Sequence, residues 1–337
     1  MAAPEQAQPV TAAVVAGPRD PATTTPPRRA GSIRRTSTVD MLRPDGWTGE
    51  LLLHGRARDL LTPVDAEATV VAEGRVEARA DAVRALSAID TTPELEATES
   101  LIGAPVGAGF RGRVDAIAAD QRDACTPLYL LLDDLPVAAL VSGYAMQRTN
   151  QIGRMPVEAY SYNTDQCAGW RAGGTLMVVL AEEVAVPMTI GPQAPDLQPA
   201  DDELAWHEID PLPAHGMRRR RRIDVTREGD VVAIDAMFRD SYMGADGIET
   251  IVHEYSCTGT VDPATGTVLA AAARPRVLPY IECPEAAASA ARLAGLSVAD
   301  LRARVRREFT GISTCTHLND LLRSLTDVGA LAAALGR

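Results

Sequence analysis

The chain has 337 residues, of which 46% are hydrophobic and 23% charged, so a sizeable core can be buried. Two domains are expected at this length, because domains commonly run about 100–200 residues. The net charge of −12 argues against a general nucleic-acid binder or a protein of anionic membrane surfaces, since both need a basic surface.

Five widely spaced cysteines argue against a secreted domain held together by disulfides, and favour a reduced, cytoplasmic setting. No apolar run approaches the roughly 18 residues that a membrane helix needs. The first residues, MAAPEQAQPV, lack the basic and apolar regions of a signal peptide.

Two stretches of unusual composition divide the chain. Residues 1–30 are rich in Pro, Ala and Thr and predict a disordered tail, because they can bury little apolar surface. Residues 191–215 are dense in proline and acidic side chains and predict a linker. The candidate domains are therefore 31–190 and 216–337.

The two candidate domains resemble each other in three ordered blocks. IRRTSTVD at 33–40 aligns with MRRRRRID at 217–224, and the Arg-Asp pair at 58–59 aligns with that at 239–240. Near the end of each domain, CTPLYLLLDDL aligns with CTHLNDLLRSL. Identities at sparse positions with small gaps at loops predict a tandem duplication, with the first copy degenerate.

Each unit reads as strands followed by helices. In the second unit, β-branched and aromatic residues predict strands at 219–225, 230–240, 249–262 and 266–278. The Asp/Gly turns MGADG and DPATG favour antiparallel hairpins. Helices are predicted at 284–295, 298–309 and 315–325. We therefore expect an α+β fold with two tandem domains, each an antiparallel sheet with helices packed on one face.

Several segments together resemble a known family. They are the Arg-Asp pair of the second strand, VHEY in the next strand, LPYIECP before the helices, and GISTCTHLNDLLRSL near the end. This combination resembles domain-of-unknown-function family 2889, and DQCAGW at 165–170 is similar to a further element of it. The resemblance covers most of residues 31–335, and CTHL is its most specific part. The family is functionally uncharacterised, so the resemblance supports the domain division and implies no chemistry.

The copies differ in polar side chains. Cys125 and Cys315 are matched, but His317 faces Pro127 in the alignment and His253 faces Ala72. The second copy thus has titratable groups where the first has apolar or small ones. One interpretation is a working site in the second unit and a structural first unit. The alternative is that the second copy faces more water at these positions.

The predicted site combines His253, His317, Asp320 and Cys315. Strand periodicity turns His253 toward the helices. Cys315 in the first turn of the last helix would have its thiol pKa lowered by the helix dipole, although residues two apart do not face each other on a helix. Spacing brings Asp320 near His317, where a carboxylate could orient the imidazole. A histidine would act as general acid or base, and Cys315 as nucleophile or as a buried pocket residue.

Other interpretations rest on weaker patterns. A metal site from His253, His317 and a cysteine at 283 or 315 is an alternative, although C-T-H is no zinc signature. The arginines at 218–222 are expected to alternate into solvent and pair with the acidic linker, or else to bind a carboxylate or phosphate ligand. The Arg-Asp pairs at 58–59 and 239–240 are expected to be structural ion pairs.

Two functional classes remain open. One is an enzyme that acts on a small metabolite through the polar site, and the other is a noncatalytic ligand- or protein-binding module with a structural Cys/His cluster. A small molecule is the expected partner, with no nucleic acid and no membrane. The sequence identifies no cofactor and leaves the reaction, the substrate and the oligomeric state open.

Overall fold

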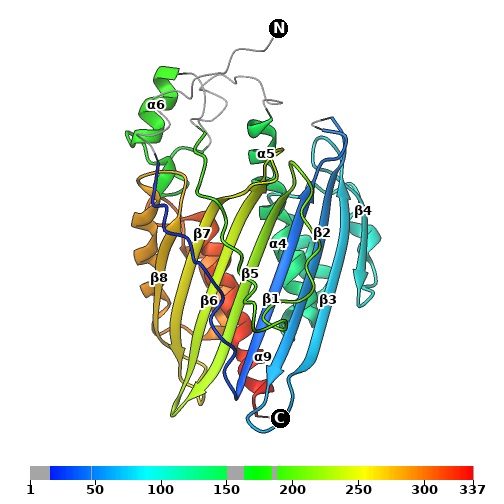
Figure 1. Ribbon diagram of the computed structural model, residues 1–337, viewed down its shortest axis with the longest axis vertical. Helices are drawn as coiled ribbons and strands as arrows, with labels where there is room; N and C mark the ends of the chain where they lie inside the picture. Colours follow the sequence, from blue (N-terminus) through cyan, green and yellow to red (C-terminus); the bar gives the residue numbers. More distant parts are fainter. Residues whose placement is uncertain (1–15, 47, 150–162, 184–187, 337) are drawn as a thin grey trace.

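The computed structural model describes residues 16–46, 48–149, 163–183 and 188–336. Its centre is one antiparallel sheet in the order β4-β3-β2-β1-β5-β6-β7-β8 (Figure 1). The strands are β1 (Ser32–Leu42), β2 (Leu51–Thr62), β3 (Thr69–Ala80), β4 (Leu86–Thr92), β5 (Met217–Glu228), β6 (Val231–Met243), β7 (Glu249–Val261) and β8 (Val268–Val277). Each half of the chain contributes a meander of four neighbouring strands.

The helices lie mainly behind the sheet in the view of Figure 1. Those of the first half are η1 (Thr98–Leu101), α2 (Phe110–Ile117), α3 (Ala119–Asp123), α4 (Pro127–Val141), α5 (Gly143–Arg148), η3 (Ala168–Trp170) and α6 (Thr175–Glu183). Those of the second half are η4 (Cys283–Leu293), η5 (Val298–Asp300), α7 (Leu301–Glu308), α8 (Thr316–Ser324), η6 (Leu325–Asp327) and α9 (Val328–Ala334). Helix α4 packs on β1, β2 and β3, whereas α9 packs across β5 and β1.

The expected α+β class and antiparallel pairing are confirmed, but the sheets are not separate. β1 pairs with β5 along almost its whole length, so the two meanders form one sheet. Pairing these strands satisfies backbone groups that would otherwise be exposed at two sheet edges. Ser37 lies opposite Arg221, which the sequence alignment makes its equivalent. The register therefore has the form that two duplicated units related by a twofold axis would give, while the duplication itself stays a prediction.

Two hydrophobic clusters lie between the sheet and the helices. One is under the first meander, where Leu131 and Leu135 of α4 pack near Val76. The other is under the second meander, where Leu318 and Leu322 of α8 belong to the same cluster as residues of β5 to β8. Both clusters follow from strand alternation and from the apolar face of each helix.

Between these clusters lies a group of buried charges, which we name the junction network. It consists of Arg35, Arg111, Arg219, Arg221, Arg302 and Arg323 with Asp59, Asp133, Asp134, Asp240, Asp320 and Asp327. Each of these aspartates is at most 9% exposed. The six positive and six negative groups balance one another, as buried charges must.

Contacts of the junction network cross from one half of the chain to the other. Arg35 on β1 contacts Asp59 at 2.6 Å and Asp327 of η6 at 2.7 Å. Arg221 on β5 donates to both carboxylate oxygens of Asp134 on α4, at 2.7 and 2.9 Å. Helices of each half are thereby tied to strands of the other.

The expectation that the arginines of 218–222 alternate into solvent is wrong. Arg219 and Arg221 are 1% exposed and face the helices, while Arg218 and Arg222 face the opposite side and are also buried. The reason is that β5 is a central strand with both faces covered. Part of the expected linker pairing is present, because Arg218 donates to the carbonyl of Asp210 at 2.7 Å.

The second face of the sheet is crossed by two extended segments, 16–31 and 190–215 (Figure 1). Trp206 packs in a small cluster with Leu197 and Met237 of β6. The ring of His207 lies between the hydroxyls of Thr36 and Thr38, with 2.9 Å to each. The segment expected to be only a linker therefore also covers the sheet.

The tail expectation differs from the structure in its second part. Residues 1–15 lie outside the described part of the chain, whereas residues 16–30 run along the sheet. The Asp20 amide donates to the Arg276 carbonyl at 2.8 Å, and Arg28 makes an ion pair with Asp202 at 2.7 Å. Polar contacts hold this segment in place. The prediction of disorder considered only how much apolar surface the segment can bury, so it missed these contacts.

One helical stretch, Pro127–Arg148, is long and apolar enough to cross a membrane by length and composition alone. The sequence-based expectation of no such run was therefore too strict. In the structure, 83% of its most apolar window is buried among other residues, as in the core helix of a folded domain.

We expect Arg221→Met to lower the free energy of unfolding by about 3–5 kcal/mol, because Asp134 would stay buried without its partner. The double variant Arg221→Met with Asp134→Leu should recover part of the loss. Urea unfolding followed by circular dichroism measures both. Arg304→Met, on the exposed face of α7, is the control and should change little; an equally small effect of Arg221→Met would contradict the role of the junction network.

The free energy of unfolding should also decrease as the pH is lowered, because of His207. Burial and, to a smaller extent, the nearby cations Arg58, Arg56, Arg218 and Arg220 together lower its pKa to about 3. The unfolded chain therefore takes up a proton first as the pH drops below about 6.5, and stability is lost between that pH and about 3.

In the variant His207→Gln, the stability difference between pH 7 and pH 5 should shrink by about 2 kcal/mol. Urea unfolding at the two pH values measures this difference. An unchanged difference in the variant would show that His207 does not carry the pH dependence.

Candidate functional site

A β-bulge sets the position of the first histidine. In the β6–β7 pair Asp240 lies opposite His253, and the register shifts immediately afterwards, between Asp240 and Ser241. The bulge moves Ile251 opposite Ser241 and away from the face of His253. The inward direction predicted for His253 is found, but the bulge breaks the strict strand alternation from which it was predicted.

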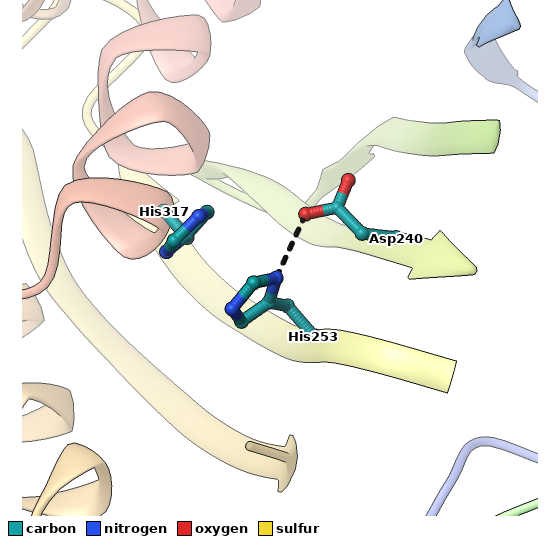
Figure 2. Close-up of side chains that lie close together, drawn as sticks. All are labelled: Asp240, His253 and His317. Carbon is teal, nitrogen blue, oxygen red and sulfur yellow. Dashed lines mark ion pairs between the residues drawn. The ribbon is translucent and has the colours of Figure 1, made fainter. Parts of the chain in front are cut away.

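The second histidine comes from the start of α8. His317 lies in the first turn of this helix, which begins after Cys315. Its ring stacks on that of His253, with centroids 3.8 Å apart and planes 21° apart (Figure 2). The structure therefore brings together these two residues, which lie 64 positions apart in the sequence.

Asp240 completes a group of three. Its Oδ2 lies 3.3 Å from Nδ1 of His253, as the dashed line in Figure 2 marks. One nitrogen or oxygen from each of Asp240, His253 and His317 lies within 4.8 Å of the others. We name these three residues the His-His-Asp site.

Arg219 of the junction network fixes Asp240. Its Nε and Nη2 donate to the two carboxylate oxygens at 2.7 and 2.8 Å. Burial alone would raise the pKa of the Asp240 carboxyl, but Arg219, together with a smaller contribution from His253, holds it well below its usual range. Asp240 is therefore a carboxylate at all physiological pH values.

His317 is a neutral imidazole near pH 7. Burial lowers its pKa well below the ordinary value, and His253 and Arg219 lower it further, while Asp240 opposes them. A neutral imidazole keeps a lone pair on one ring nitrogen, which can accept a proton or bind a metal ion.

Cys315 does not have the activated thiol that its helix position suggested. It is 5% exposed and belongs to the hydrophobic cluster of the second half. Burial and, to a smaller extent, Cys167 raise the pKa of its thiol to about 12, and the backbone N–H groups at the helix start only partly oppose this rise. Its Sγ lies 3.9 Å from Nδ1 of His317. The geometry therefore favours a buried residue over a nucleophile.

Asp320 is not part of the His-His-Asp site. Its carboxylate contacts Arg111 at 2.9 Å, Arg323 at 3.4 Å and Arg219 at 3.6 Å, all within the junction network. The idea that Asp320 orients His317 is therefore not supported, because three arginines already contact this carboxylate.

The structure also changes the partners of the Arg-Asp pairs. Arg239 pairs with Glu254 and Asp240 with Arg219, because adjacent strand residues point to opposite faces. In the first half, Asp59 pairs with Arg35 in the same way. Strand alternation already argues against an ion pair between adjacent residues of one strand. The same alternation turns Asp240 to the inner face, where it lies beside His253.

The five cysteines should resist labelling in the folded protein. All five are free and buried, and they are Cys125, Cys167, Cys257, Cys283 and Cys315. We expect a colorimetric disulfide reagent at pH 8 to react slowly with the native chain and to titrate five thiols after unfolding. Rapid modification of Cys315, identified by mass spectrometry, would contradict its burial.

The comparisons with known proteins give a family and no activity. Residues 217–330 match the model of a family described as "Protein of unknown function (DUF2889)". No curated protein and no solved structure shows a significant match to the chain. The matched range runs from β5 into α9 and contains all three residues of the His-His-Asp site. The second half of the chain is therefore similar to a family of unknown function, and the match does not extend to the first half.

Proposed function

We propose that the His-His-Asp site binds a divalent transition-metal ion, and that the protein uses this ion to act on a small molecule. One distance carries the proposal. His253 Nδ1 is buried without a hydrogen bond, although Asp240 Oδ2 lies only 3.3 Å away. Hydrogen bonds of this type measure about 2.7–3.2 Å, whereas two ligands of one tetrahedral zinc ion lie about 3.3–3.4 Å apart.

The ligand types support the same proposal. Two imidazoles and one carboxylate suit zinc and non-haem iron(II), and three protein ligands leave a position for water or substrate. The side chain of His253 is 12% exposed, so the site reaches the surface. The stacked rings must turn so that both lone pairs converge on one ion. A bound ion would supply Lewis-acid character or an activated water molecule there.

Arg219 would act as the outer support of the carboxylate ligand. A carboxylate has about four lone-pair positions, so Asp240 can accept two bonds from Arg219 and still bind an ion. Hydrogen-bonded outer groups commonly orient metal ligands in this way. The charge of Arg219 is offset by Asp320, 3.6 Å away.

The first half of the chain offers an internal comparison. Its Arg35–Asp59 pair has the same form, Asp59 lies opposite Ala72, and the register again shifts directly after this aspartate. The bulge and the Arg–Asp pair are thus found in both halves, while Ala72 and Pro127 stand where the sequence alignment places the histidines. The two histidines are therefore additions of the second half, which the architecture does not require.

A metal-free alternative is general acid–base catalysis by His253, oriented by Asp240. This arrangement needs a hydrogen bond between the two side chains, and the geometry at 3.3 Å does not form one. The alternative metal site with a cysteine is disfavoured, because within the described residues neither Cys283 nor Cys315 joins the group of close ligand atoms. We further propose a cytoplasmic location, which the five free cysteines support.

The test is metal binding by the purified, chelator-treated protein. We expect calorimetry with Zn²⁺ to give one site per chain, and Co²⁺ to give the absorption bands of a tetrahedral ion. His253→Ala and His317→Ala should each weaken binding at least about 100-fold, since each removes a ligand.

His54→Ala is the matched control, because this exposed histidine on β2 lies outside the site. Its affinity for Zn²⁺ should equal that of the wild type. Stoichiometric binding that survives in both His253→Ala and His317→Ala would overturn the proposal, as would a wild-type chain that binds neither ion. Circular dichroism of each variant checks that the fold is kept.

A further inference from the structure

A cavity lies where helices of the two halves meet, and we name it the junction pocket. Its volume is about 850 Å³, which is within the range of small-molecule sites. The first half contributes Asp115, Arg122 and Tyr129, and the second half contributes Arg302, Ala303 and Arg306 among others. None of the three residues of the His-His-Asp site lines it.

One face of α7 and the turn before it forms a wall of this pocket. Ala299, Arg302, Ala303 and Arg306 follow the spacing of a single helix face. The alanines leave space on this face, and Arg302 and Arg306 place guanidinium groups on it. Small residues Ala124, Gly329 and Ala330 also line the pocket, so part of its lining is apolar.

The pocket is positive in an otherwise acidic chain. Five arginines and two aspartates line it, whereas the whole chain has a net charge of −12. The arginines are Arg122, Arg302, Arg306, Arg307 and Arg323. Arg302 and Arg323 are each paired with an aspartate of the junction network. The other three arginines face the two lining aspartates, which leaves an excess of one positive charge to attract an anion.

The deeper arginines are only partly satisfied. Arg302 makes an ion pair with Asp327 at 2.8 Å and Arg323 one with Asp133. Within the described residues, the Nε of each is buried and has no hydrogen-bond acceptor. These Nε atoms are closed to the pocket, so an anion there would act on the two arginines through its charge and not through a hydrogen bond to Nε.

The outer arginine is available to a ligand. Arg306 is 46% exposed, and its closest carboxylate, Asp115, is 3.7 Å away. Asp115 also accepts a hydrogen bond from the hydroxyl of Tyr129, whose ring carries Arg302 at 4.5 Å from its centre. An acidic group could thus contact Arg306 while an apolar body lies along the alanines.

We propose that the junction pocket binds a small organic anion, namely a carboxylate or phosphate monoester with an apolar body. The apolar lining selects the body and the arginines select the charge. The pocket is separate from the His-His-Asp site, so this proposal does not depend on metal binding.

The probes are phenyl phosphate, benzoate, inorganic phosphate and phenol, measured by calorimetry and thermal shift on the full chain. We expect phenyl phosphate or benzoate to bind one per chain, inorganic phosphate to bind more weakly because it lacks the body, and phenol to bind more weakly because it lacks the charge. Whether phenyl phosphate or benzoate binds more tightly assigns the acidic group.

Two variants and one control locate the binding. Arg306→Gln should weaken binding about fivefold, the value of one charge contact at a partly exposed site. Ala303→Phe should weaken it more than about tenfold by filling the pocket without changing the charge. The control Arg304→Gln removes the same charge from α7. Arg304 pairs with Glu308 and does not line the pocket, so this variant should leave the affinity unchanged.

Three outcomes would overturn the proposal. One is the absence of binding by phenyl phosphate and benzoate. Another is equal weakening by Arg304→Gln and Arg306→Gln, which would show a general charge effect. The third is inorganic phosphate binding as tightly as phenyl phosphate and unaffected by Ala303→Phe, which would show an adventitious ion only.

Discussion

The junction network is the constraint on which the rest of the structure depends. β1 and β5 are central strands covered on both faces, so the arginines that they carry toward the helices must be neutralised by buried carboxylates. Asp134 on α4 and Asp327 on η6 meet this need from opposite halves of the chain. Removing a partner from such a pair leaves a buried charge, so the pairs specify one arrangement of helices on strands. The halves are therefore joined both by backbone pairing and by charge.

The same network positions the His-His-Asp site. Arg219 holds the carboxylate of Asp240, and the bulge that follows Asp240 keeps His253 opposite it. The first half has the Arg–Asp pair and the bulge but lacks the histidines. The pair and the bulge therefore belong to the architecture, whereas the histidines are not needed for it. A rigid, charged support next to two imidazoles is suited to holding metal ligands in place.

The junction pocket uses the network from the other side. Arg302 and Arg323 pair with aspartates of the network and also line the pocket, so two of its guanidinium groups are placed there by the way the halves are joined. A cavity between helices of two halves is a common place for a ligand, since small residues there leave space that neither half fills. The two proposed sites thus share one support and have different chemistry, imidazole nitrogens in one and guanidinium groups in the other.

The sequence by itself determined the local features: the order of strands and helices, the antiparallel hairpins, the helix start near Cys315 and the inward face of His253. These follow from periodicity and turn residues, which act over a few positions. Only the tertiary structure decided that β1 and β5 join into one sheet, that Asp240 replaces Asp320 beside the histidines, and that burial keeps the thiol of Cys315 protonated. The partners of each buried charge, such as Arg35 and Asp327, can lie nearly 300 residues apart, and strand alternation shows which face a side chain takes without showing what covers that face.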